Sequence, residues 1–128
     1  SKHIALLHGT IYKNHCMSCG KSYDAKYIFN SKDIPRCSCG DIIKPDVVLY
    51  EEGLDNDTVN YAINMLREAD LLIIAGTSLT VYPASSFIHY YGGKNIVIIN
   101  RDTTSYDNMA TLVIHDSIGN IFSKLKEE

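Results

Sequence analysis

The stretch Leu71-Leu72-Ile73-Ile74-Ala75-Gly76-Thr77-Ser78 decides the fold class. Its five apolar residues show no polar alternation, which is typical of a strand covered on both faces in a parallel sheet. Glycine and two hydroxyl residues follow directly, and at the carboxyl end of a parallel strand such small residues let the backbone approach a phosphate or a ribose. The same residues also form ordinary turns, so this stretch alone leaves both interpretations open.

Similar apolar runs lie on both sides of this stretch. They predict further strands at residues 46–50, 96–99 and 112–114, and a strand at residues 4–7 that ends at His8-Gly9. Asn100 closes one of these runs, where it is either a turn residue or a hydrogen-bonding partner for a ribose hydroxyl. The short apolar runs predict a sheet whose strands are buried on both faces.

Helical patterns alternate with the strands. The first helix has Asp55 and Asp57 as candidate caps and an apolar stripe at helical spacing, formed by Val59, Ala62, Ile63 and Leu66. The second begins at Pro83 and ends at Gly92-Gly93. The third is capped by Ser117 and has one apolar face, formed by Ile118, Ile121, Phe122 and Leu125. This order predicts an α/β fold with a parallel sheet and right-handed crossovers.

Length and composition exclude several classes of protein. With 128 residues, 45% hydrophobic and 21% charged, the chain has the make-up of a globular unit and not of a disordered or collagen-like one. A net charge of -3 disfavours nucleic-acid binding through phosphate neutralisation. The apolar runs are far shorter than the ~20 residues that cross a membrane. No secretory signal is recognised at Ser1, so a cytoplasmic location is expected.

The four cysteines form two close pairs that predict a structural zinc site. Seventeen residues separate the pairs, a glycine follows each pair, and the ligands would be Cys16, Cys19, Cys37 and Cys39. Four thiolates leave no coordination position for a reactive water molecule. Disulfides or buried free thiols are the alternatives, and His15 beside Cys16 is an alternative ligand. The change of pattern near Pro45 predicts a zinc-binding module at residues 11–43 and a second domain made of residues 1–10 and 44–128.

Five motifs in this order resemble those of the sirtuins, the NAD-dependent protein lysine deacylases. They are Leu7-His8-Gly9-Thr10, the cysteine pairs, Lys44-Pro45-Asp46-Val47-Val48, Gly76-Thr77-Ser78-Leu79 followed by Val81-Tyr82-Pro83-Ala84, and Ile98-Ile99-Asn100. The resemblance implies a partial Rossmann-type parallel sheet with helices on both faces, together with a small zinc ribbon. It also implies that NAD and an acyl-lysine peptide or protein meet in a cleft between the two.

The resemblance assigns roles to residues of this sequence. His8 matches the catalytic histidine. In the implied mechanism the acyl oxygen attacks the ribose C1′ as nicotinamide leaves, and the histidine then acts as general base on a ribose hydroxyl, which leads to free lysine and O-acyl-ADP-ribose. The cofactor-binding residues would be Gly76, Thr77, Ser78, Asn100, Arg101, Asp102 and Ile118, the last of which is otherwise a core position. The substrate would pair with Val48, Tyr50, Glu51, Glu52, Gly53 and Leu54 as an added strand.

The sequence departs from the sirtuin pattern in four respects. Many sirtuins carry Phe-Gly-Glu where this chain has Tyr50-Glu51-Glu52, which makes the substrate edge more acidic. The second cysteine pair has one intervening residue instead of two. The Gly-Ala-Gly turn that cradles the pyrophosphate and the Gln-Asn-Ile-Asp stretch of the nicotinamide side do not occur in the chain.

Two hypotheses about function follow from these departures. In the first, the chain is the carboxyl-terminal portion of an NAD-dependent deacylase and carries its catalytic base, zinc module and half of its cofactor loop. In the second, the chain alone is an inactive zinc-bearing α/β scaffold. Both hypotheses can hold together, because the chain is expected to be catalytically incomplete and inactive on its own. A zinc ribbon that contacts nucleic acid is disfavoured by the charge. Because a parallel sheet without its first strands has an unpaired edge, we also expect self-association through that edge.

Overall fold

The computed structural model describes residues 1–125 and divides into two compact units, Ser1–Val59 and Asn60–Glu128. The mixed α/β class with a parallel sheet is confirmed. The predicted boundaries of the zinc module at residues 11 and 43 stay a prediction. Among the described residues, the helices are all too short or too polar to cross a membrane.

The first unit contains an antiparallel sheet of three strands in the order β2-β1-β3. Its elements are β1 (Gly9–Cys16), β2 (Ser22–Asp24), α1 (Ala25–Phe29) and β3 (Ile43–Val47). Tyr23 and Ile28 pack on a small core made of Cys16, Cys37 and Ile43. Two of the four predicted zinc ligands, Cys16 and Cys37, therefore also belong to the hydrophobic core of this unit, whereas Cys19 and Cys39 are exposed.

Two strand predictions in this unit were wrong. The segment 46–50 was expected in the parallel sheet, but β3 ends at Val47 and runs antiparallel to β1, with Gly9 opposite Val47. No strand forms at residues 4–7, because the chain turns there: the Gly9 N–H donates to the Leu6 carbonyl oxygen at 2.9 Å and Gly9 has a φ of 74°. Several apolar side chains of the two segments are more than half exposed, among them Ile4, Leu49 and Tyr50, so their apolar character indicated neither burial nor membership of the parallel sheet.

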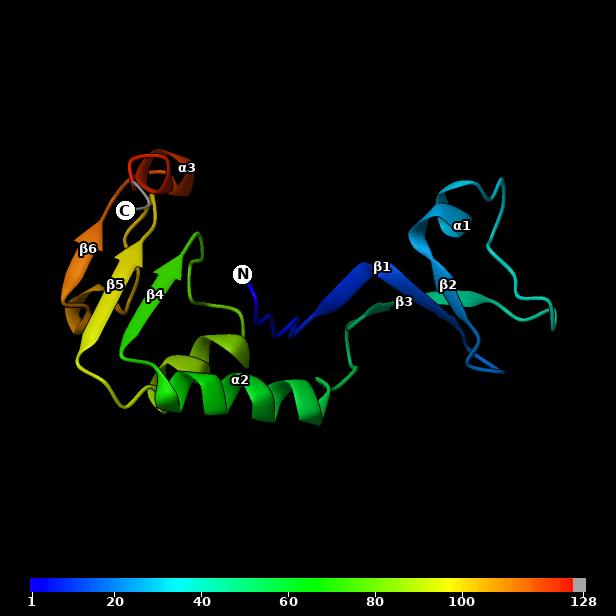
Figure 1. The fold of residues 1–128 in the computed structure, drawn as a ribbon, viewed down its shortest axis with the longest axis horizontal. Coiled ribbons are helices and arrows are strands. Elements are labelled where there is room, and N and C mark those ends of the chain that lie inside the picture. Colours follow the sequence, from blue (N-terminus) through cyan, green and yellow to red (C-terminus); the bar gives the residue numbers. More distant parts are fainter. Residues whose placement is uncertain (126–128) are drawn as a thin grey trace. The chain divides into compact units, whose positions relative to one another are not determined.

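The second unit contains the parallel sheet, in the order β4-β5-β6 (Figure 1). Its strands are β4 (Leu71–Ala75), β5 (Asn95–Ile99) and β6 (Leu112–Ile114). The central strand β5 is covered on both faces, and Ile98 has no exposed surface. On β4, however, Leu71 is 49% and Ile73 45% exposed, so the expectation of burial on both faces holds only for the middle strand.

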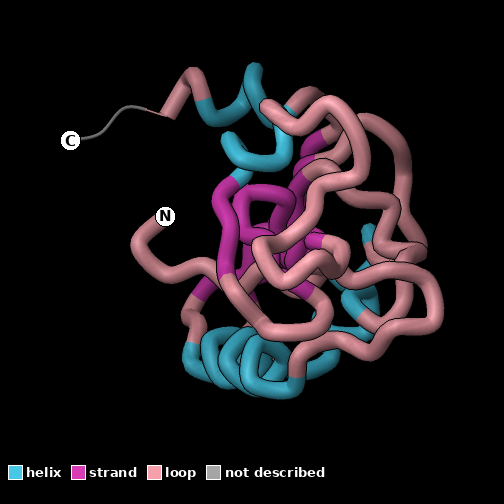
Figure 2. Tube along the Cα trace, turned by 90° about the vertical axis from the view of Figure 1, so that its right-hand side faces the viewer, coloured by secondary structure: helices cyan, strands magenta, loops and turns pink. Residues whose placement is uncertain are grey.

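The predicted helices form with changes at two of them. The stripe predicted for the first helix is the half-buried face of α2 (Asn56–Glu68), and Asp55 caps it by accepting the Thr58 N–H at 2.8 Å. The segment after Pro83 is a 3-10 helix, η1 (Ala84–Tyr90), instead of an α-helix. A second 3-10 turn, η2 (Asp107–Met109), precedes β6, and α3 (Ile118–Phe122) is capped by Ser117 as predicted but ends before Leu125. Figure 2 shows these helical segments in cyan among long pink loops.

Candidate functional site

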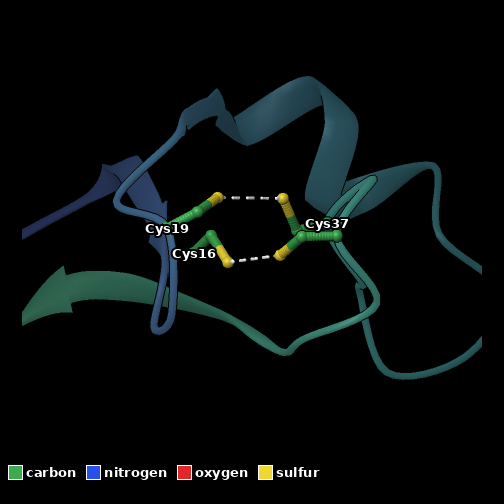
Figure 3. Close-up of side chains that lie close together, drawn as sticks. Cys16, Cys19 and Cys37 are labelled. Atoms are coloured by element: carbon green, nitrogen blue, oxygen red, sulfur yellow. Dashed lines mark hydrogen bonds between the residues drawn. The ribbon is translucent and has the colours of Figure 1, made fainter.

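The four cysteine sulfur atoms come together in the first unit. All four lie within 4.8 Å of one another, with Cys16 and Cys39 3.4 Å apart and Cys19 and Cys37 3.5 Å apart. Figure 3 shows the labelled Cys16, Cys19 and Cys37 turning their sulfur atoms toward a common centre. A zinc tetrahedron with Zn–S bonds of ~2.3 Å has S–S edges of about 3.8 Å. The arrangement therefore fits a four-thiolate zinc site.

Two similar turns place these sulfur atoms. In the first, the Gly20 N–H donates to the Cys16 carbonyl oxygen at 3.0 Å, and in the second the Gly40 N–H donates to the Cys37 carbonyl oxygen at 2.8 Å. Both glycines have a positive φ, 69° and 95°, which residues with a side chain rarely adopt. The shorter spacing of Cys37 and Cys39 therefore does not prevent the second turn from forming.

The electrostatics of the cluster also favour a bound cation. The backbone N–H of Cys39 and the hydroxyl of Tyr23 lower the pKa of Cys37 to about 5. The backbone N–H of Asp41 favours the thiolate of Cys39 too, but the sulfur atoms of Cys16 and Cys37 outweigh it and raise the pKa of Cys39 to about 12. The Cys37 thiolate therefore offers a negative charge to a cation, whereas Cys39 loses its proton only when a metal ion binds the cluster, since metal binding to thiols releases their protons.

The predicted catalytic histidine lies beside the predicted substrate segment. The Val48 N–H donates to the carbonyl oxygen of His8 at 3.1 Å, directly after the β1–β3 pairing ends. A cavity of about 520 Å³ lies in the same unit and is lined by Val48, Glu52 and Gly53 together with residues of β1 and β3. The imidazole of His8 is exposed, as is Tyr50. The structure thus brings the backbone of His8 and the start of the substrate segment together, although His8 is not among the described residues that line the cavity.

Glu51 occupies a conformation that favours glycine. Its φ is 70°, and this is the position at which many sirtuins carry the glycine of Phe-Gly-Glu. A residue with a side chain in the left-handed region costs roughly 1–2 kcal/mol relative to glycine. The loop keeps the turn that glycine would allow, and the substitution adds a carboxylate at its exposed tip.

Sequence reasoning missed one polar contact of this cavity. His15 Nδ1 contacts Asp46 Oδ1, which joins β1 to β3, and both residues line the cavity. The sequence indicates His15 as a surface or boundary residue, with zinc binding as its alternative role. The ring instead faces Asp46, 31 residues further along the chain, and no local pattern indicates that pairing.

Most of the predicted cofactor residues gather around a second cavity, in the second unit. It measures about 400 Å³, and its lining residues follow β4 and β5 and surround the start of α3. Figure 1 shows α3 near the ends of these strands. Five of the predicted residues line it: Gly76, Asn100, Arg101, Asp102 and Ile118. Thr77 and Ser78 are not among the described residues that line it. Three lining residues were not predicted, Asp116, Ser117 and Gly119, although the cap of α3 was a signal that could have indicated them.

Hydrogen bonds hold the loops around this cavity. The Gly76 N–H donates to the Ile99 carbonyl oxygen at 3.0 Å, and Asn100 Nδ2 donates to the Asp102 carbonyl oxygen at 2.9 Å. The backbone N–H of Ser117 and the side chain of Asn120 lower the pKa of Asp116. Ile118 lies against Gly76, because a Cβ added at Gly76 would be only 2.5 Å from Cδ1 of Ile118. The cavity has a size that suits a small ligand.

Comparison with known proteins identifies the family. The model of the Sir2 family matches residues 1–83. The NAD-dependent protein deacetylase of Clostridium tetani is 50% identical over 100% of this chain and 53% of its own length. That of Clostridium acetobutylicum is 52% identical over 94% of this chain and 50% of its own length. The chain thus spans about half the length of the curated relatives it matches.

The solved structures that resemble this chain are also of Sir2 proteins. The structure of Sir2 in complex with an inhibitor, 2'-O-acetyl-ADP-ribose and a deacetylated p53 peptide has a TM-score of 0.87, with 31% identity over 97% of this chain and 55% of that one. Sir2 with a p53 peptide and NAD+ has a TM-score of 0.84, with 32% identity over 97% of this chain and 54% of that one. On the family model and these matches, the chain belongs to the Sir2 family.

Proposed function

We propose that this chain contributes to NAD-dependent deacylation of lysine side chains in proteins. The observation that carries the proposal is the cavity at the ends of β4 and β5, because five residues predicted to bind NAD line it. The placement of His8 beside the predicted substrate segment supports it independently. The relatives named as NAD-dependent protein deacetylases match the chain over both units.

Each part of the chain has a distinct role in this proposal. NAD supplies the ADP-ribosyl group that accepts the acyl group when nicotinamide leaves. Gly76 lets the backbone approach the bound nucleotide, while Asn100 and Asp102 offer polar groups to its ribose and Ile118 an apolar surface to its adenine. His8 accepts the proton of a ribose hydroxyl, and the zinc cluster, with four protein ligands, stabilises the first unit without reacting.

A titration with ADP-ribose tests the cofactor cavity. We expect the chain to bind it, and we expect Gly76→Ala to weaken binding by about tenfold or more, since the new Cβ meets Ile118 and the φ of 64° disfavours alanine. Gly92→Ala is the matched control, because a Cβ there meets nothing within 4 Å and the residue does not line the cavity. Calorimetry that shows no binding by the unsubstituted chain would contradict the proposal.

The alternative is a zinc-bearing scaffold without turnover of its own. Release of nicotinamide from NAD in the presence of an acetyl-lysine peptide separates the two functions. Turnover by this chain that is lost in His8→Ala establishes the deacylase. Binding of ADP-ribose with no release of nicotinamide favours the scaffold.

We also propose that the chain associates with itself through β4. Within residues 1–125, β4 pairs only with β5, and Leu71 and Ile73 are half exposed beside its free edge. An unpaired parallel strand with apolar side chains favours pairing with a second strand. Light scattering at high concentration is expected to show dimers or larger species, and Leu71→Lys is expected to shift them toward monomers. A monomer at every concentration would disprove the association.

A cytoplasmic location is proposed from the cysteines. None of the four forms a disulfide, and all are gathered at one site, which suits a reducing compartment. Cell fractionation checks this location, and recovery of the protein from an oxidising compartment would contradict it.

A further inference from the structure

The loop after β3 is closed by an ion pair between Lys44 and Glu52. Lys44 Nζ donates to Glu52 Oε2 at 3.1 Å and to the Val47 carbonyl oxygen at 3.0 Å. The Lys44 side chain is only 18% exposed, while that of Glu52 is 44% exposed, so the pair is shielded from water on the lysine side alone. One lysine therefore joins both ends of the segment 47–52.

Glu52 contacts the middle of the same segment. Its Oε2 atom accepts the Leu49 N–H at 2.9 Å, and the Glu52 N–H donates to the Leu49 carbonyl oxygen at 3.1 Å. The Leu49 N–H and the ammonium of Lys44 lower the pKa of Glu52, which keeps the carboxylate charged. Hydrogen bonds between charged and neutral groups of this kind are stronger than those between neutral groups.

The start of the segment is attached to the catalytic histidine. The Val48 N–H donates to the His8 carbonyl oxygen, and Val47 lies opposite Gly9 in the β1–β3 register. The ion pair, the two Leu49 hydrogen bonds and this attachment leave the segment little freedom to move away from His8. We propose that Lys44 and Glu52 are positioning residues, which hold the segment 47–52 in the conformation that binds an acyl-lysine peptide beside His8.

This inference rests on the proposed function, and it separates the two acidic residues at the loop tip. Glu52 is paired with Lys44 and accepts the Leu49 N–H of the same loop. Glu51 is exposed and makes no hydrogen bond or ion pair to any described residue. The two carboxylates thus differ in role although they are neighbours in sequence. A substitution that removes the charge of Glu51 therefore serves as the control for one that removes the charge of Glu52.

The first measurement is amide hydrogen exchange of the loop. Glu52→Ala is expected to raise the exchange rate of the Leu49 amide by about tenfold, the effect of one lost charge-assisted hydrogen bond, and to raise that of Val48 as well. Glu52→Gln restores an acceptor for Leu49 and is expected to recover part of the protection. Lys44→Met should raise both rates, whereas Glu51→Gln should leave them unchanged.

The second measurement is the affinity for a fluorescent acetyl-lysine peptide. Glu52→Ala and Lys44→Met are expected to weaken peptide binding about tenfold, while the affinity for ADP-ribose stays unchanged because its cavity is lined by residues of the second unit alone. Unchanged exchange, or unchanged peptide affinity in both variants, would overturn the positioning role and leave the proposed function standing. If the unsubstituted chain binds no acetyl-lysine peptide, it is the proposed function that fails.

Discussion

Replacement of Cys16 by alanine is expected to unfold the sheet of the first unit. Cys16 is 1% exposed and belongs both to the sulfur cluster and to the small core with Cys37 and Ile43. Binding of zinc to four thiolates contributes about 10–16 kcal/mol in small zinc-binding peptides, which exceeds the stability that so small a core can supply. Loss of one ligand therefore removes most of the free energy that keeps β1, β2 and β3 paired.

Native mass spectrometry and amide exchange check this result. The unsubstituted chain is expected to carry one zinc ion, and Cys16→Ala to carry none and to lose protection of the amides in β1, β2 and β3. Ser38→Ala is the matched control, because Ser38 lies between Cys37 and Cys39 but is exposed. A strong chelator should reproduce the effect of Cys16→Ala. A chain that keeps this sheet without zinc would disprove the structural role of the metal.

The sequence was sufficient for the features that depend on local pattern. The stripe from Val59 to Leu66 predicted the half-buried face of α2, and two close cysteine pairs predicted one cluster. Ser117 was likewise recognised as a cap, and it accepts the Asn120 N–H. These features follow from spacings of a few residues, which the sequence shows directly.

Features that depend on pairing between distant segments were beyond prediction from the sequence. The run at residues 46–50 is as apolar as a parallel strand, but its partner is β1, and hydrophobicity does not specify a partner. The contact of His15 with Asp46 arises only once that pairing exists. The same holds for Lys44 and Glu52, whose roles emerge from the loop that they close.

Substitution of Gly9 by alanine is expected to destabilise the β1–β3 pairing beside His8 strongly. Its φ of 74° already disfavours alanine, and a Cβ there would overlap the carbonyl oxygen of Asp46 and lie 3.1 Å from the Cα of Val47. Because the obstructing atoms are backbone, the β1–β3 pairing must separate where it adjoins His8. We expect Gly9→Ala to lower the free energy of unfolding by about 3 kcal/mol or more, the sum of backbone strain and overpacking.

Substitution of Gly20 separates the effect of steric overlap from that of backbone strain. Gly20 has a similar φ of 69°, but a Cβ there meets nothing within 4 Å, so Gly20→Ala carries the backbone strain alone, about 1–2 kcal/mol. Urea unfolding of both variants gives the difference, and exchange of the Val48 amide shows whether its hydrogen bond to His8 is lost. Equal losses of stability in the two variants would mean that the overlap at Asp46 contributes nothing. A larger loss in Gly9→Ala, with faster exchange of Val48, would tie the close approach of β1 and β3 to the position of His8.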